Sequence, residues 1–205
     1  GYSLASSDKR NFFEVCDVTE GIQNVINDVR DYDYLLNAIK KFKPEIIFHL
    51  AAQPLVSESY DNPKLTFETN INGTINLLEI ANRVPSIKAF INVTSDKCYE
   101  DTNKIEGYVE TDRLGGFDPY SSSKACSEHI TYSHLNIIQN TERISSLGIA
   151  TVRAGNVIGG GDWNKDRLIP DSIIALEKGD SIQVRNPEFV RPWQHVLDPL
   201  NGYLI

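Results

Sequence analysis

Short apolar runs of strand length, separated by stretches with helical periodicity, restrict most strongly how this chain can fold. Residues 45–52 and 87–93 are almost continuously apolar, which is typical of strands buried in a parallel sheet. Between them, a helix is predicted to begin at Asn62-Pro63 and to end near Asn82. Its expected buried stripe is Phe67, Ile71, Ile75 and Leu78.

The same alternation continues along the chain. Residues 1–20 are predicted to form a polar loop. Strands are expected at 25–30, 149–154 and 182–184, and helices at 32–42, 119–139 and 170–178, the last one ended by Gly179. Alternating strands and helices predict βαβ units with right-handed crossovers. We therefore expect an α/β protein with a Rossmann-like, doubly wound parallel sheet that helices cover on both faces.

A helix-start signal coincides with a pair of residues capable of acid–base chemistry. Asp118 is a favourable N-cap, and Pro119 suits the first helical position. Tyr120 and Lys124 are four residues apart and therefore lie on one face of the predicted helix. A nearby ammonium favours the phenolate and lowers the pKa of a tyrosine. Tyr120 is thus a candidate base, and the alternative is a surface Tyr/Lys pair on an ordinary helix.

Polar segments follow three of the predicted strands. They are Ala51-Ala52-Gln53, Thr94-Ser95-Asp96-Lys97 and Ala154-Gly155-Asn156. In open parallel sheets, ligands bind outside the carboxyl ends of the strands. We expect these segments to line one crevice.

Composition excludes several classes of protein. The 205 residues carry a formal charge of -8, with 40% hydrophobic and 23% charged residues, and no run of Lys or Arg that would favour nucleic-acid binding. No apolar stretch approaches the roughly 18 residues of a membrane span, so we expect a cytoplasmic protein. The three cysteines match no metal-site spacing, so reduced thiols and no metal are expected.

Six segments together resemble the extended short-chain dehydrogenase/reductase family. They are His49–Pro54, Thr94–Tyr99, Asp118–Lys124, Arg153–Trp163, Asp166–Asp171 and Arg191–Leu197. The resemblance extends from Val25 to Ile205 and is greatest to the branch that dehydrates nucleotide sugars, with CDP-glucose as substrate. It implies an NAD-dependent lyase that forms a 4-keto-6-deoxy sugar in deoxysugar and lipopolysaccharide biosynthesis. It also implies a homodimer formed through the two long helices.

The resemblance divides the chain at residue 156. Residues 1–156 would form a partial NAD-binding domain, and residues 157–205 would begin a substrate-binding region. The Gly-rich turn that normally follows the first strand of such a domain does not occur before Asp28. We therefore expect the first β-α unit to lie upstream of Gly1.

Catalytic roles implied by the resemblance fall on five residues. Tyr120 would take the proton of the sugar C4 hydroxyl, Lys124 would hold the phenolate, and Thr94 would hydrogen-bond the C4 oxygen. Asp96 would be the general acid for loss of the C6 hydroxyl. Lys97 would be the C5 base or, equally, a charge that orients Asp96.

Binding roles are implied for two further groups of residues. The expected cofactor contacts are Asp28, Val29, Leu50, Ala51, Ala52, Gln53 and Asn70, together with Thr94, Tyr120 and Lys124. The expected nucleotide-sugar contacts are Asn156, Arg167, Arg191 and His195, since Arg binds diphosphates in a bidentate manner. His49 is interpreted as a core histidine, and Trp163 and Trp193 as packing residues.

Three other hypotheses compete with dehydration. A nucleotide-sugar 4-epimerase of the same family needs Tyr120, Lys124 and Thr94, but not the acid/base pair Asp96-Lys97. A non-catalytic member of the fold need not keep Tyr120 and Lys124 together. A chain without the cofactor loop could also be inert as it stands.

Overall fold

A computed structural model describes residues 1–205 except 7, 9, 103 and 140–146. The chain forms two compact units. Unit 1 comprises Gly1–Ile26 and Gly155–Ile205, and unit 2 comprises Asn27–Ala154. The expected substrate-binding region lies in unit 1, whereas the expected cofactor domain is divided between the units. Within the described ranges, no helix has the length and apolar character needed to cross a bilayer.

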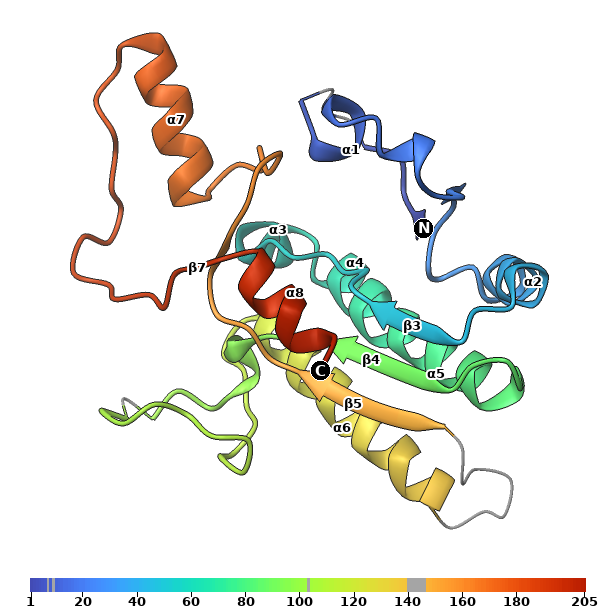
Figure 1. The fold of residues 1–205 in the computed structure, drawn as a ribbon. Coiled ribbons are helices and arrows are strands. Elements are labelled where there is room, and N and C mark those ends of the chain that lie inside the picture. Colours follow the sequence, from blue (N-terminus) through green and yellow to red (C-terminus); the bar gives the residue numbers. More distant parts are fainter. Residues whose placement is uncertain (7, 9, 103, 140–146) are drawn as a thin grey trace. The chain divides into compact units, whose positions relative to one another are not determined.

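Unit 2 contains a parallel three-stranded sheet (Figure 1). Its order is β3 (Ile46–His49), β4 (Ala89–Val93), β5 (Gly148–Val152), and the register pairs Ile46 with Ala89 and Ala89 with Gly148. The helices are α2 (Tyr32–Phe42), α3 (Val56–Asp61), α4 (Pro63–Phe67), the π-helix η2 (Glu68–Asn72), α5 (Gly73–Arg83), the 3-10 helix η3 (Asp96–Cys98) and α6 (Pro119–Gln139). The predicted Rossmann-like α/β class is confirmed.

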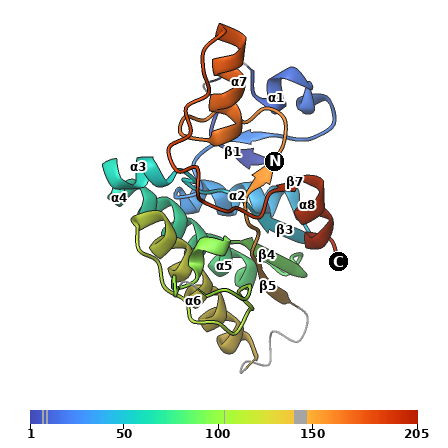
Figure 2. The same ribbon diagram turned by 90° about the vertical axis from the view of Figure 1, so that its left-hand side faces the viewer.

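Helices α5 and α6 lie along one face of this sheet (Figure 2). Phe90 and Asn92 of β4 are buried, and Asn92 hydrogen-bonds to α6. In contrast, Ile46 and Phe48 of β3 are 54% and 37% exposed. The expectation that β3 is buried on both faces was therefore wrong, because α5 and α6 of this unit cover only one face.

The helix expected at 62–82 begins at Pro63 but contains the π-helix η2 in its middle. Its buried residues include Thr66, Asn70 and Thr74, whereas Phe67 is 36% exposed. Thr74 Oγ1 lies 3.0 Å from the Ser127 hydroxyl and donates to the Asn70 carbonyl at 2.7 Å. These polar groups can be buried because they have hydrogen-bond partners, which an apolar pattern does not reveal.

Several predicted helix ends agree with the structure. Helix α2 has the expected bounds and buries Leu35 and Ile39. At the start of α6, Asp118 acts as the predicted N-cap, since its Oδ1 accepts a hydrogen bond from the Ser121 amide at 2.9 Å. Gly179 ends α7 (Leu168–Lys178) in the left-handed conformation, with φ 72°.

Unit 1 holds two parallel strand pairs and short helices. Strand β1 (Tyr2–Ser3) pairs with β2 (Val25–Ile26), and β6 (Val157–Ile158) pairs with β7 (Gln194–His195). The helices are α1 (Phe12–Val15), the 3-10 helix η1 (Val18–Glu20), α7 (Leu168–Lys178) and α8 (Leu197–Tyr203).

Three expectations for unit 1 and its border were wrong. Residues 1–20 are not a loop throughout, because they contain β1, α1 and η1. The strand expected at 25–30 ends at Ile26, before a turn. Residues 182–184 form no strand, and Ile182 and Val184 are exposed, because so short an apolar run has no neighbouring strand among the described residues.

Two helical glycines provide a matched test of packing. A Cβ at Gly73 would lie 2.7 Å from Val29 Cγ1, whereas a Cβ at Gly202 would have no heavy atom within 4 Å. Overpacking should make Gly73→Ala lower the free energy of unfolding by about 1–2 kcal/mol. Gly202→Ala should raise it by up to ~1 kcal/mol through helix propensity. Urea unfolding of both variants checks this, and equal changes would contradict it.

Candidate active site

Residues Thr94 to Lys97 extend β4 beyond its carboxyl end. The amide of Thr94 donates to the Val152 carbonyl at 2.9 Å, and the amide of Asp96 donates to the Ala154 carbonyl at 3.1 Å. Ser95 caps η3 by accepting the Lys97 amide at 3.2 Å. Thr94 and Ser95 are buried, Asp96 is half-buried and Lys97 is exposed. Asp96 and Lys97 thus lie at the carboxyl end of β4, as predicted.

Tyr120 and Lys124 occupy the first two turns of α6 and are buried. Lys124 Nζ donates to the Val93 carbonyl at 3.1 Å, so its ammonium lies against the last residue of β4. Burial lowers the pKa of Lys124 to about 8, although the charge of Glu128 works in the opposite direction. The structure therefore brings Lys124 to the point where the polar segment after β4 begins.

The hydroxyl of Thr94 faces the protein interior. It donates to Glu128 and lies 3.2 Å from the Val152 carbonyl, and a hydroxyl has only one proton to donate. The Ser95 hydroxyl instead lies 3.0 Å from Asp96 Oδ1. Side chains alternate along a strand, so Thr94 continues the α6-facing row of Asn92, whereas Ser95 points to the other side. This alternation could have identified Ser95 from the sequence.

Glu128 and Arg153 were also not selected from the sequence. They form a buried ion pair, with Arg153 Nη2 2.8 Å from Glu128 Oε2. Burial acts to raise the pKa of Glu128, but hydrogen bonds from Arg153, Thr94 and Thr151 outweigh it and hold the pKa below its ordinary value. The spacing in the sequence could have identified Glu128, because it follows Lys124 by four residues and therefore lies on the same helical face.

Asn70 connects the segment after β3 to the start of α6. Its Oδ1 accepts the Gln53 amide at 2.8 Å, and its Nδ2 donates to the Gln53 carbonyl at 3.1 Å and to the Ser123 hydroxyl at 2.8 Å. Ser123 in turn donates to the Tyr120 carbonyl at 2.7 Å. Of the other expected cofactor contacts in this segment, Leu50 is exposed, and Ala51 and Ala52 are half-buried. Gln53, Asn70 and Tyr120 therefore form one connected group.

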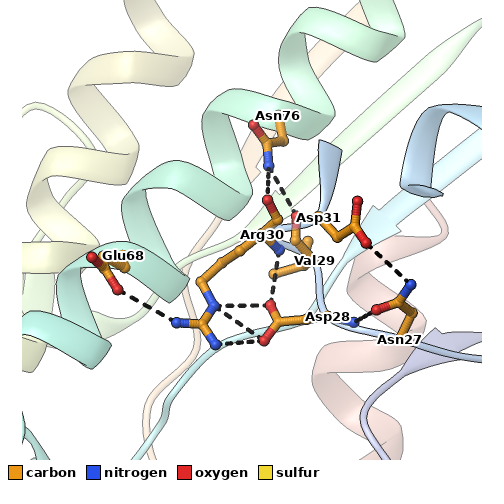
Figure 3. A network of polar contacts seen from close by, with 7 residues as sticks. All are labelled: Asn27, Asp28, Val29, Arg30, Asp31, Glu68 and Asn76. Carbon is orange, nitrogen blue, oxygen red and sulfur yellow. Dashed lines mark hydrogen bonds and ion pairs between the residues drawn. The ribbon is translucent and has the colours of Figure 1, made fainter. Parts of the chain in front are cut away.

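Asp28 and Val29 lie in a turn that α5 holds in place (Figure 3). Both carboxylate oxygens of Asp28 accept hydrogen bonds from the Arg30 guanidinium, at distances of 2.6 to 3.1 Å, which lowers the pKa of Asp28. Asn76 Nδ2 donates to the carbonyls of Val29 and Arg30, at 3.1 and 3.2 Å. Two hydrogen bonds from α5 thus hold the turn of these two expected cofactor contacts, and a ligand that bound the Asp28 carboxylate would share it with Arg30.

His49 is buried in the core, as interpreted from the sequence. Its Nε2 lies 3.1 Å from the Thr74 hydroxyl, while its Nδ1 has no hydrogen-bond partner among the described residues. Burial, with a contribution from the Lys124 charge, lowers the pKa of His49 to about 3. The imidazole is therefore neutral at physiological pH.

The four expected nucleotide-sugar contacts belong to unit 1. Asn156 directly precedes β6 and its carbonyl accepts the Gln194 amide at 3.0 Å, whereas His195 lies in β7 and pairs with Ile158. Arg167 precedes α7, and its Nε forms an ion pair with Asp162 Oδ2 at 3.8 Å. Arg191 is exposed, and its guanidinium lies 5.0 Å from the Phe189 ring centroid.

Trp163 packs within unit 1, in agreement with its interpretation as a packing residue. Its Nε1 donates to the Arg10 carbonyl at 2.9 Å, and the Arg10 guanidinium lies 4.2 Å from a Trp163 ring centroid. Trp193 is 42% exposed.

The three cysteines, Cys16, Cys98 and Cys126, are free thiols, as expected. Burial raises the pKa of Cys98 to about 12, so this thiol stays protonated. Among the residues with described positions, no group of three or more His, Cys, Asp or Glu side chains could hold a metal ion.

Comparison with known proteins points to one family. A family model described as GDP-mannose 4,6 dehydratase matches residues 5–204. A CDP-glucose 4,6-dehydratase of Salmonella typhimurium is 47% identical over the whole chain, which spans 58% of that relative. A UDP-glucose 4-epimerase of Mycoplasma genitalium is 29% identical over 90% of the chain and 57% of its own length.

The fold has a close counterpart among solved structures. A dTDP-glucose 4,6-dehydratase from Bacillus anthracis, solved in complex with NAD, matches with a TM-score of 0.77 and 25% identity. The match covers 94% of this chain and 57% of the other. The chain therefore spans less than two thirds of the relatives that it matches.

The buried charge of Lys124 should affect stability in a pH-dependent way. Folding lowers the pKa of Lys124 from 10.5 to about 8, so stability should rise as pH increases through this range, by about 3 kcal/mol at most. The Lys124→Met variant lacks this rise. Its free energy of unfolding relative to the unmodified chain should therefore fall by that amount between pH 7 and pH 10.5.

Urea unfolding of both chains across this pH range measures the difference. Lys41→Met, at an exposed lysine, is the matched control and should give a smaller change. A stability difference for Lys124→Met that is constant with pH would show that the ammonium is not held in a buried, charged state.

Proposed function

Because this chain belongs to the GDP-mannose 4,6-dehydratase family, we propose that it forms part of an NAD-dependent nucleotide-sugar 4,6-dehydratase that acts on CDP-glucose. The observation that carries the proposal is the 47% identity, over the whole chain, to a CDP-glucose 4,6-dehydratase. Identity to the UDP-glucose 4-epimerase is lower, at 29%. The product would be CDP-4-keto-6-deoxyglucose, a precursor in deoxysugar and lipopolysaccharide biosynthesis.

The residues of unit 2 fit a nicotinamide cofactor. Lys124 is buried, and within the described chain its ammonium makes one hydrogen bond, to the Val93 carbonyl. An ammonium has three N–H groups, so two remain to bind ribose hydroxyls. Ala51 and Ala52, after β3, are small enough for a ligand to approach the backbone closely. NAD, when bound, would take a hydride from the sugar C4 and return it to C6.

Oxidation at C4 requires a base for the hydroxyl proton. We assign this role to Tyr120, which lies at the start of α6, one turn before the buried Lys124, whose ammonium would support a negative charge on the phenol. The pKa of about 8 keeps Lys124 mostly protonated at neutral pH. Bound substrate would have to draw the Ser95 hydroxyl proton away from Asp96 Oδ1, and the C4 oxygen would then accept a hydrogen bond from Ser95. We propose this role for Ser95 in place of Thr94, whose hydroxyl is buried and donates to Glu128.

Elimination of water then requires an acid and a base. The C4 ketone acidifies the C5 proton, which a base removes, while Asp96 donates a proton to the C6 hydroxyl, which leaves as water. Half-burial of Asp96 at the carboxyl end of β4 supports this role. Lys97 is exposed and can reach a ligand, but it can accept the C5 proton only if bound substrate buries it and makes it neutral. Otherwise Lys97 serves as the charge that orients Asp96.

The nucleotide diphosphate would bind to residues of unit 1. Arg167 and Arg191 supply the positive charge, and Asn156 and His195 supply polar groups beside the β6–β7 pair. Arg167 Nε lies 3.8 Å from Asp162 Oδ2, so a bound diphosphate would compete with this carboxylate for the guanidinium. The proposal also includes the homodimer and the cytoplasmic location that the family resemblance implies.

A 4-epimerase of the same family is the second candidate, and Asp96-Lys97 after β4 argues against it. The third candidate is that the 205-residue chain is catalytically inert, because the Gly-rich turn of the cofactor site does not occur before Asp28. Calorimetric titration of NAD into the 205-residue chain tests this last alternative, because tight binding would exclude it.

Incubation of the natural full-length protein with CDP-glucose and NAD in deuterated water tests the reaction. Removal and replacement of the C5 proton should place solvent deuterium at C5 of a product that has lost one water, as measured by mass spectrometry and NMR. A C4 epimer that has lost no water would refute dehydration and support the second candidate.

The two hydroxyls after β4 should differ in their effect on catalysis. Ser95→Ala should lower kcat by about 10²-fold, because a hydrogen bond to the reacting oxygen is lost. Thr94→Val should lower the free energy of unfolding by about 1–3 kcal/mol, because an acceptor on Glu128 loses its donor, and should lower kcat less. Steady-state kinetics and urea unfolding of both variants decide the point. A larger loss of kcat in Thr94→Val would restore the original assignment.

A further inference from the structure

The carboxylate of Glu128 accepts more hydrogen bonds than a carboxylate in a simple surface ion pair. Its Oε1 accepts hydrogen bonds from the Thr94 hydroxyl and from Arg153 Nε at 2.8 Å. Its Oε2 accepts hydrogen bonds from the Thr151 hydroxyl and from Arg153 Nη2, both at 2.8 Å. The side chain is only 4% exposed. A buried carboxylate with four donors, two of them from one guanidinium, is strongly fixed in orientation.

Arg153 connects the Glu128 carboxylate to Tyr99. Its Nη1 donates to the Tyr99 hydroxyl at 2.9 Å, and its guanidinium lies 4.9 Å from the Tyr99 ring centroid. Tyr99 also stacks on Tyr108, with ring centroids 4.8 Å apart. Glu128 itself contacts Thr94. The ion pair therefore binds both residues that flank the segment Ser95–Cys98, one through each partner.

That segment carries the acid and the candidate base of the proposed elimination, Asp96 and Lys97. It is a single short 3-10 turn, and such a turn has little stability of its own. The position of its side chains relative to α6 therefore depends on what holds its two ends. A small misplacement of a catalytic group has a large effect on rate.

We propose that Glu128 is a positioning residue which, through its ion pair with Arg153, fixes both ends of the 95–98 turn and so holds Asp96 and Lys97 in register with Tyr120 and Lys124. The inference rests on the proposed function for its catalytic consequence, but the holding of the turn is a property of the fold alone. Glu128 itself touches no substrate in this account. Its effect on the reaction is exerted through the turn.

Hydrogen exchange of the natural full-length protein tests the holding of the turn without any substrate. In Glu128→Gln, peptides that contain residues 94–99 should exchange about ten-fold faster, because the Asp96 amide loses the support of its flanking anchors. Arg153→Lys keeps the positive charge but not the bidentate geometry or the Tyr99 contact, so it should give the same direction of change. This second variant keeps the test valid if Glu128→Gln does not fold.

Asn92→Ala is the matched control. Asn92 is buried at the same α6–β4 interface and donates to Ser127 and Thr131, but it has no hydrogen bond to the turn or to Glu128 among the described residues. It should leave exchange of residues 94–99 near that of the unmodified protein. Equal acceleration in Asn92→Ala and Glu128→Gln would overturn the proposal, because general loosening of α6 would then account for both.

Kinetics with CDP-glucose and NAD test the catalytic consequence. Glu128→Gln should lower kcat by about 10- to 100-fold with little change in KM, because a positioned acid and base act on bound substrate. Asn92→Ala removes hydrogen bonds between β4 and α6 but leaves the contacts of the turn intact, so it should lower kcat less than Glu128→Gln does. Faster exchange of 94–99 with unchanged kcat would overturn the positioning role. If the unmodified protein does not dehydrate CDP-glucose, the proposed function fails, and the exchange result alone decides whether Glu128 holds the turn.

Discussion

Hydrogen bonds attach helix α6 to η2, α5 and β4 within unit 2, and the geometry of the candidate site depends on them. Ser123, Ser127 and Thr131 of α6 form hydrogen bonds with Asn70, Thr74 and Asn92. Each such bond contributes only about 0.5–1.5 kcal/mol, but it is directional. Because hydrogen bonds need a defined geometry, this polar interface favours one position of α6 along and about its axis. That position fixes where Tyr120 and Lys124 lie.

This register explains why a lysine can be buried next to a strand end. The ammonium of Lys124 meets the Val93 carbonyl, and the carboxylate of Glu128 lies one helical turn further along. Burial alone would favour the neutral amine, and the nearby negative charge partly offsets this effect. The result is a cation that is close to its own titration point. Such a group can support an anionic phenol and still respond to what binds beside it.

Sequence periodicity predicted the long elements well and the polar details poorly. Helices α2 and α6, the Asp118 cap and the Gly179 stop follow from local chemistry that acts within a few residues. The predicted buried stripe of α4–α5 was right for Leu78 and wrong for Phe67, and it missed Asn70 and Thr74, which are stabilised by partners from α6 that are distant in sequence. The same holds for the site. Tyr120, Lys124, Asp96 and Lys97 were chosen from a motif, but the different orientations of Thr94 and Ser95, and the contacts of Glu128, depend on which side of β4 faces α6.

The π-helix η2 has a consequence for how the family can vary in this region. A π turn holds one residue more than an α turn, so it marks the place where an extra residue has been accommodated in an otherwise continuous α4–α5 helix. Deleting one residue there would convert the π turn into a regular α turn and change the backbone position of Asn70. Asn70 would then leave either Gln53 or Ser123, and the β3 loop would no longer be connected to α6. Length variation in homologues should therefore be tolerated in the surface loops and avoided within residues 68–72.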